Sequence, residues 1–311
     1  LLDAFLHKPV NQSLLFDTIM ELFGRAGHDH SQPPAPKEHP QRDECIPRHV
    51  AGARILVVED NSINQEVARE WLESGGMSVT TANNGRIALD TLQQAQPFAA
   101  VLMDIQMPEM DGLEATRRIR RDHRFDHLPI IGMTAHALQG DREQGLEAGM
   151  DDYITKPIDP DQLFATLGRY IQGNHQNHHQ NPAVAPKLPD NKDDRDLDLH
   201  ALSLPGIDLR AGLLRANGKP TLYLKLLKSF QADFASADQD IHKALQRENM
   251  SEARRLAHSI KGVAANIGAG HLGDRAAALE QAIASSQVDL DAHLWQDFVH
   301  ALHQVISGLD Q

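Results

Sequence analysis

The sequence predicts an α/β domain followed by an all-α domain: a doubly wound, five-stranded parallel sheet and then an antiparallel four-helix bundle. Two observations lead to this fold class. Apolar runs of strand length alternate with helical patterns across residues 53–173, whereas residues 205–311 carry helical patterns only. The segments before and between these domains have no apolar period and are rich in Pro, His and charged residues, which is typical of linkers.

The strands of the α/β domain are predicted from short apolar runs, and each is followed by a helical pattern. The run at 99–103 is apolar throughout, as expected for a strand that is buried on both faces of a parallel sheet. Five successive strand–helix units predict an open sheet with helices on both faces. The predicted strands are 55–58, 78–82, 99–103, 130–133 and 152–154, and the predicted helices are 62–75, 84–95, 111–121, 138–148 and 159–171.

The all-α domain is predicted from apolar residues that recur at helical spacing. Gly206, the string Gly218-Lys219-Pro220 and Ser251 mark breaks and caps between the helices. Long helices with short connections favour an antiparallel bundle. The predicted helices are 208–215, 220–247, 251–267, 269–285 and 291–309.

Residues 1–24 repeat the end of the α/β domain. Lys8-Pro9 corresponds to Lys156-Pro157, and the apolar residues that follow both pairs keep one constant spacing. We therefore expect the last strand and helix of a second, truncated copy of that domain, which lacks the strands needed to fold independently. We expect flexible linkers at 25–52 and 174–204.

The composition excludes several function classes. With 43 acidic and 30 basic residues the net charge is −13, which argues against nonspecific binding to nucleic acid. No apolar run approaches the ~18 residues of a membrane-spanning helix, so we expect no membrane contact by this chain. The single Cys45 excludes an internal disulfide and fits the reducing cytoplasm. Because the chain begins with Leu1, we expect a fragment of a longer protein.

Acidic or polar residues end four of the five predicted strands, namely Glu59 and Asp60, Asp104, Thr134 and Lys156. Taken alone, Asp104 could simply end its strand, but the carboxyl ends of parallel strands share one edge, where these side chains should converge. Three carboxylates in one pocket repel each other and need a cation, and all-oxygen ligands suit Mg²⁺. A carboxylate nucleophile, a metal, a lysine and a hydroxyl donor are the groups that phosphoryl transfer onto a carboxylate requires.

Four segments resemble the bacterial response-regulator receiver domain, which has a flavodoxin-like fold, and the match extends over 53–173. They are Val57-Val58-Glu59-Asp60-Asn61, Met103-Asp104-Ile105-Gln106-Met107-Pro108-Glu109-Met110-Asp111-Gly112, Met133-Thr134-Ala135 and Tyr153-Ile154-Thr155-Lys156-Pro157.

The resemblance to the receiver domain implies a role for each residue at the strand ends. Asp104 would be the phospho-acceptor, and Asp60 would bind Mg²⁺ directly. Glu59 would act mostly through water, and the backbone carbonyl of Gln106 would complete the protein ligands. Lys156 would hold the phosphoryl group, aimed by a cis bond to the following proline. A conformational switch would be made by two further residues, Thr134 and Tyr153.

A second candidate site lies on the predicted helix at 251–267. Its apolar stripe should face the bundle core, and His258 falls off that stripe, so we expect the imidazole to point to solvent. Lys261, Gly262 and Ala265 lie on the same side of the helix. A glycine in mid-helix costs about 1 kcal/mol relative to alanine, which suggests that another protein must approach here. The alternative is that His258 is an idle surface residue.

The strings His258-Ser259-Ile260-Lys261-Gly262 and Asn266-Ile267-Gly268-Ala269 resemble the histidine phosphotransfer (HPt) domain over 205–311. The resemblance implies that His258 accepts and donates a phosphoryl group and that the domain has no ATP site. Lys261 could offset charge on the phosphorylated ring, and the small residues Gly262 and Ala265 would admit a docking partner.

A receiver and an HPt domain behind a receiver remnant resemble the C-terminal part of a bacterial hybrid sensor histidine kinase. The function this implies is a phosphorelay from a histidine kinase core to Asp104, then to His258 and then to a downstream response regulator. We find no Gly-rich phosphate loop, and the kinase core is absent from the chain, so whether the fragment counts as an enzyme stays open. The full-length protein would be anchored in the inner membrane by parts outside this sequence.

Two other function classes compete with this interpretation. A phosphatase of the haloacid dehalogenase type also uses an aspartate nucleophile, Thr, Lys and Mg²⁺, but it requires a second aspartate two residues after the nucleophile, where this chain has Gln106. A docking scaffold that is not phosphorylated would be indicated by loss of the acidic or lysine residues, and none is lost.

Overall fold

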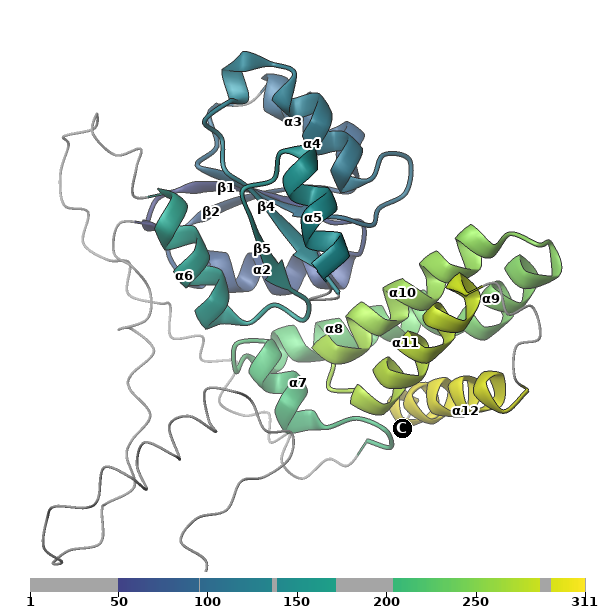
Figure 1. Ribbon diagram of the computed structural model, residues 1–311. Helices are drawn as coiled ribbons and strands as arrows, with labels where there is room; N and C mark the ends of the chain where they lie inside the picture. The colour runs from purple at the N-terminus through teal and green to yellow at the C-terminus, as the bar shows by residue number, and fades with distance from the viewer. Residues whose placement is uncertain (1–49, 95, 136–138, 172–203, 286–291, 311) are drawn as a thin grey trace, which may run out of the picture. The chain divides into compact units, whose positions relative to one another are not determined.

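The computed structural model describes residues 50–94, 96–135, 139–171, 204–285 and 292–310 (Figure 1). The predicted truncated repeat at 1–24 lies outside the described residues, as do nearly all of the two predicted linkers. Within the described ranges, no helix is both long enough and apolar enough to span a bilayer.

Five parallel strands form one sheet in the order β2-β1-β3-β4-β5, which confirms the predicted sheet. The strands are β1 (Arg54–Val58), β2 (Ser78–Ala82), β3 (Ala100–Asp104), β4 (Ile130–Thr134) and β5 (Asp152–Thr155). Every residue of β3 and β4 is buried, because helices cover both faces of the sheet. The order reverses between β1 and β3, the position at which open α/β sheets bind ligands.

Helices cover the sheet on two sides, as doubly wound folds require (Figure 1). They are α2 (Ser62–Ser74), α3 (Gly85–Gln94), α4 (Gly112–Arg120), α5 (Gln139–Ala148) and α6 (Pro160–Ile171), with a short 3-10 helix at His123–Phe125. Successive residues of β1 alternate between two cores. Ile55 and Val57 pack with apolar residues of α2 and α6, whereas Leu56 and Val58 pack with those of α3 and α4. This alternation explains why the strands read as continuous apolar runs.

The C-terminal domain is helical throughout its described residues, in agreement with the predicted bundle. Its helices are α7 (Leu209–Arg215), α8 (Pro220–Phe234), α9 (Ala237–Gln246), α10 (Met250–Asn266), α11 (Gly270–Ala284) and α12 (Ala292–Leu309). Helix α10 packs against α9 and α11, and α12 packs against α11 and α8. The four arms of the bundle are therefore α10, α11, α12 and an interrupted arm made of α8 and α9.

The prediction of a single helix at 220–247 is wrong, because the structure has two helices there, α8 and α9. Buried apolar residues continue at helical spacing through Phe230, Phe234, Ala237 and Ile241, so the sequence pattern does not register the break. At the break, the Ser236 hydroxyl bonds Asp240 Oδ2 at 3.2 Å and the Ser236 carbonyl accepts the first hydrogen bond of α9. A serine followed by acidic residues in the next turn was the available signal for a new helix start.

Candidate functional site

Three carboxylates meet at the carboxyl edge of the sheet. Glu59 and Asp60 follow β1, and Asp104 is the last residue of β3. One oxygen of each carboxylate lies within 4.8 Å of the other two. Glu59 and Asp104 are buried, and Asp60 is partly exposed. The strand register thus brings together residues that are far apart in the chain, as the sequence predicted.

The backbone around this cluster is shaped by local caps and one close approach. The Asn61 side chain caps α2 by accepting from the backbone N–H groups of Ile63 and Asn64, which turns the chain sharply after the acidic pair. After Asp104, the loop returns so closely that a Cβ on Gly112 would collide with the Asp104 carbonyl oxygen. The loop that carries Gln106 therefore lies tightly over the end of β3, and the Gln106 N–H donates to Asp104 Oδ1 at 3.3 Å.

Lys156 bridges two of the three carboxylates from the end of β5. Its Nζ lies 2.6 Å from Glu59 Oε2 and 2.8 Å from Asp104 Oδ2, and the peptide bond to Pro157 is cis. Although burial disfavours the ammonium form, the negative charges of Asp104 and Glu59 raise the pKa of Lys156 above its usual value. Lys156 is therefore a fixed positive charge in contact with Asp104.

The three carboxylates outnumber the positive charges beside them, which are Lys156 and, 3.8 Å from Asp60 Oδ2, the guanidinium of Arg255 on α10. Burial raises the pKa of Asp104 to about 7, with Glu59 adding to the shift and Lys156 opposing it. Burial and Glu59 also raise the pKa of Asp60. A group of crowded carboxylate oxygens is a donor set that suits a hard divalent cation such as Mg²⁺.

The two predicted switch residues lie on neighbouring strands. Thr134 is buried at the end of β4, and its carbonyl accepts the Lys156 N–H at 2.7 Å. The Tyr153 ring, on β5, occupies space that a Cβ on Gly132 or Gly145 would fill, and its hydroxyl donates to Met150 Sδ at 3.3 Å. The structure thus holds the Tyr153 ring against β4 and α5.

His258 does not point to solvent, so this expectation was wrong. Its side chain lies on the off-stripe face of α10, but it is only 9% exposed, and Nδ1 lies 2.9 Å from Glu280 Oε1 on α11. Lys261 Nζ lies 3.2 Å from the other oxygen of Glu280. Burial alone would raise the pKa of Glu280, but the hydrogen bonds and charges of His258 and Lys261 lower it to about 2. His258 therefore contacts a carboxylate that is ionised near neutral pH.

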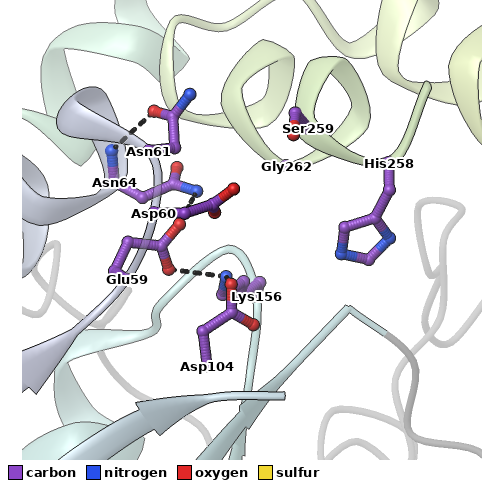
Figure 2. A pocket seen from close by; sticks show the side chains of 9 residues that line it. All are labelled: Glu59, Asp60, Asn61, Asn64, Asp104, Lys156, His258, Ser259 and Gly262. Carbon is purple, nitrogen blue, oxygen red and sulfur yellow. Dashed lines mark hydrogen bonds and ion pairs between the residues drawn. The ribbon is translucent and has the colours of Figure 1, made fainter. Parts of the chain in front are cut away.

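Asp104 and His258 line the same cavity, which Figure 2 shows from close by. The edge of the imidazole opposite Nδ1 is directed toward the carboxylates. The cavity is formed by residues of both domains, which are Glu59, Asp60, Asn61, Asn64, Asp104, Lys156, His258, Ser259 and Gly262. Residues of the two candidate sites predicted from the sequence therefore line one cavity.

Small residues on α10 permit this approach. A Cβ built on Gly262 would have a single neighbour within 4 Å, the side-chain nitrogen of Asn64 on α2, at 3.6 Å. Ala265 lies one turn further along α10 and is partly exposed. Next to it, Asn266 Nδ2 donates to Asn64 Oδ1 at 2.8 Å. At Gly262 and Asn266, helix α10 therefore packs closely against α2.

Three residues of this site had no functional role in the sequence analysis: Glu280, Asn64 and Asn266. Glu280 is 3% exposed beside the apolar residues Ala276, Leu279 and Ile283 of α11. A carboxylate on the buried face of an amphipathic helix was a readable signal, but its partner His258 is on another helix. Asn64 and Asn266 bond to each other across the two domains, and sequence spacing does not reveal such a contact.

Two family models match the chain, one in each domain. Residues 55–168 match the response regulator receiver domain family, and residues 225–311 match the Hpt domain family. The sensor histidine kinase GacS of Pseudomonas protegens is 34% identical over 220 residues, which are 69% of this chain and 23% of that protein. Hybrid signal transduction histidine kinase I of Dictyostelium discoideum is 42% identical over 131 residues, which are 39% of this chain and 8% of that protein.

The chain thus spans less than a quarter of the length of these relatives. A solved structure is also similar: the receiver domain of the sensor histidine kinase PA1611 from Pseudomonas aeruginosa PAO1, with a magnesium ion coordinated in its active site cleft. It is 45% identical, and the match covers 39% of this chain and 99% of that one with a TM-score of 0.37.

Proposed function

We propose that the chain passes a phosphoryl group from Asp104 to His258 within one molecule. It contains a receiver domain and an Hpt domain that are homologous to those of hybrid histidine kinases. This pair of domains supports a function in phosphorelay signal transduction. The observation that carries this proposal is that Asp104 and His258 line one cavity. The donor to Asp104 is a histidine kinase core, and the acceptor from His258 is a downstream response regulator.

In the first step, an oxygen of the Asp104 carboxylate attacks the phosphorus of a kinase phosphohistidine. The new P–O bond replaces the P–N bond, and the kinase imidazole keeps the electron pair and takes up a proton from solvent. Lys156, 2.8 Å from Asp104 Oδ2, offsets the charge on the phosphoryl oxygens. The hydroxyl of Thr134, at the neighbouring strand end, donates to one of those oxygens.

In the second step, Nε2 of His258 attacks the same phosphorus. The P–O bond breaks, and its electron pair returns to the Asp104 carboxylate. Because the Glu280 carboxylate can only accept a hydrogen bond, Nδ1 of His258 keeps its proton, and Nε2 carries the lone pair that attacks. Glu280 then stabilises the positive charge that develops on the ring as the N–P bond forms.

The acidic cluster fits a Mg²⁺ ion. Glu59, Asp60, Asp104 and the backbone carbonyl of Gln106 would hold it, with Glu59 acting mostly through water. When bound, the ion would supply positive charge for the phosphoryl oxygens that Lys156 does not reach. The observation behind this assignment is the set of three converging carboxylates, of which Asp104 has a pKa raised to about 7.

The remaining residues of the site have supporting roles. Thr134 and Tyr153 form the switch pair, in which the Thr134 hydroxyl moves toward the phosphoryl group and the Tyr153 ring turns inward. On the Hpt side, Gly262 and Ala265 keep α10 close to α2, and Lys261 holds Glu280 in place through its 3.2 Å ion pair. We further propose that residues 1–24 are the remnant of a preceding receiver in a hybrid kinase of bacterial origin that is anchored in the inner membrane.

Acetyl phosphate tests the proposed order of transfer. The full chain is incubated with acetyl phosphate and Mg²⁺, and intact mass and label stability are followed over time. We expect a base-labile phosphoryl group on Asp104 that converts into an acid-labile, base-stable form on His258. Asp104→Asn should block all labelling, and His258→Gln should leave the label base-labile. Labelling of Asp104→Asn to the wild-type level, or full labelling in excess chelator, would contradict the proposal.

A further inference from the structure

A chain of hydrogen bonds joins the Hpt helix α10 to the acidic pocket of the receiver. Asn266 Nδ2 on α10 donates to Asn64 Oδ1 on α2 at 2.8 Å, and Asn64 Nδ2 donates to Glu59 Oε1 at 2.8 Å. Lys156 donates to the other oxygen of Glu59 at 2.6 Å and lies 2.8 Å from Asp104. Each of these side chains is less than a tenth exposed. The chain of contacts is therefore buried along its length, where hydrogen bonds strengthen one another.

The chemistry of the partners fixes the orientation of both amides. The Glu59 carboxylate can only accept, so the NH₂ group of Asn64 faces it and the Asn64 oxygen faces α10. That oxygen needs a donor, which the NH₂ group of Asn266 supplies. Turning the Asn266 amide over would bring two oxygens together. One Hpt side chain therefore determines, through Asn64, how Glu59 is held.

Asn266 is not explained by the fold of its own domain. Its Oδ1 is a buried atom without a hydrogen-bond partner among the described residues. A buried unpaired oxygen lowers stability, so a residue retained at such a position needs another reason. Its side-chain nitrogen donates to Asn64 in the receiver, which points to a role between the domains.

We infer that Asn64 and Asn266 are positioning residues that couple docking of the Hpt domain to the cation site of the receiver. The inference rests on the proposed function, because it takes Glu59 to belong to the Mg²⁺ site. When α10 is docked, Glu59 is held from both sides, by Asn64 and by Lys156, in the orientation that serves the cation. The coupling is reciprocal: bound cation strengthens docking by the same factor by which docking strengthens cation binding. The pocket is thus best formed when His258 is in place to receive the phosphoryl group.

Calorimetric titration of the full chain with Mg²⁺ measures this coupling. We expect Asn266→Ala to weaken Mg²⁺ binding by about 3- to 10-fold. This loss is at or below the low end of the loss in metal affinity that follows removal of a hydrogen-bond partner of a metal ligand. Asn64→Ala should weaken it at least as much. In the double variant the two effects should not add, because both substitutions break one chain of contacts.

Lys219→Ala is the matched control. Lys219 makes a 2.8 Å ion pair with Glu70 on α2, so it also joins the two domains, but it does not touch the chain of amides. We expect this variant to keep the wild-type Mg²⁺ affinity within about twofold, as for an isolated ion pair near the surface. An equal loss in Lys219→Ala and Asn266→Ala would show that docking in general is responsible and would overturn the inference.

Hydrogen exchange supplies a second readout. Mg²⁺ should slow the exchange of α10 amides in the wild type and have little effect on them in Asn266→Ala. Asn64→Ala tests the same link from the receiver side, so the inference remains testable if either variant folds poorly. Wild-type affinity in Asn266→Ala would overturn the inference alone. A wild-type chain that does not bind Mg²⁺ would overturn both the proposed cation site and the inference.

Discussion

Glu280 is the residue that sets the chemistry of His258. It is buried on α11 and contacts Nδ1 of the imidazole at 2.9 Å and Lys261 at 3.2 Å. A buried carboxylate between two basic groups stays ionised, as the lowering of its pKa to about 2 indicates. His258 is thereby held in one tautomer and one ring orientation. This arrangement resembles the way in which a buried carboxylate orients the histidine of a catalytic triad.

We expect Glu280→Gln to slow phosphoryl transfer from Asp104 to His258 by about 10-fold or more, because the neutral amide no longer stabilises charge on the ring. The measurement is the rate at which base-labile label becomes base-stable in the full chain. Asp240→Asn is the matched control, since Asp240 is a surface carboxylate on α9 that pairs with Lys243. A normal transfer rate in Glu280→Gln would show that Glu280 serves stability alone.

The same residue predicts a pH dependence of stability. The pKa of Glu280 is lower in the folded state, about 2, than the ordinary value of 4.5. Its contribution is therefore fully present above about pH 4.5 and is lost as the pH falls toward 2. We expect the difference in unfolding free energy between wild type and Glu280→Gln to shrink across this range, as measured by urea unfolding at several pH values. A difference that does not change with pH would contradict this assignment.

The surroundings of His258 could not be predicted from the sequence, whereas the convergence of the strand-end residues could. The spacing of apolar residues correctly placed His258 outside the apolar stripe of α10. The side chain is nevertheless buried. The ring is covered by Glu280 from α11 and lies in a cavity shared with receiver residues. By contrast, Glu59, Asp60, Asp104 and Lys156 were predicted to converge because parallel strand ends must share an edge. The topology of a parallel sheet alone brings the ends of its strands together, whereas contacts between helices and domains depend on how the whole chain packs.

Helix α10 presents Gly262, which has no side chain, to α2. The Cβ position of Gly262 is 3.6 Å from Asn64 Nδ2, which is ordinary van der Waals contact. Alanine therefore fits at this position, whereas a longer side chain would push the two helices apart. The sequence pattern singled out this glycine partly by its helix-propensity cost, and the structure shows that its neighbour on the facing helix is Asn64.

We expect Gly262→Ala to transfer the phosphoryl group at close to the wild-type rate and Gly262→Gln to transfer it at least about tenfold more slowly, because a displacement of about 1 Å is costly for a reaction that requires alignment. Both variants should unfold at or above the wild-type temperature, since glycine is the poorer helix former. Equal transfer rates in the wild type and Gly262→Gln would contradict close docking of α10 on α2.

Elements also differ in how well the sequence defines them. The five strands and their helices were predicted to within about two residues because each strand is short, is bounded by polar turns and is followed by a helical pattern. The break between α8 and α9 was missed because Phe234 and Ala237 continue the apolar period across it. Periodicity reports which face is buried, and a face can stay buried while the backbone turns.

In the molecule as a whole, polar contacts outside the lining of the shared cavity join the two domains. Trp71 Nε1 donates to the Arg215 carbonyl at 3.1 Å, and the Arg215 guanidinium donates to the Ile158 carbonyl at 3.0 Å. Glu66 pairs with Lys225 at 3.0 Å and Glu70 with Lys219 at 2.8 Å. In each of these ion pairs the receiver supplies the carboxylate and the Hpt domain the cation. This charge arrangement orients the domains and should be weakened by salt.

Because both domains belong to one chain, transfer within a molecule should be much faster than transfer between molecules. A covalent connection gives an effective concentration of roughly millimolar, about 100-fold above a protein concentration of about 10 µM. To separate the two routes, His258→Gln protein labelled on Asp104 is mixed with Asp104→Asn protein, so that label can reach His258 only in the other molecule. At about 10 µM we expect this mixture to transfer about 100-fold more slowly than the wild type, whose rate should not change on dilution. Equal rates in the mixture and the wild type, or a wild-type rate that rises with protein concentration, would mean that the cavity shared by Asp104 and His258 is not the route of transfer.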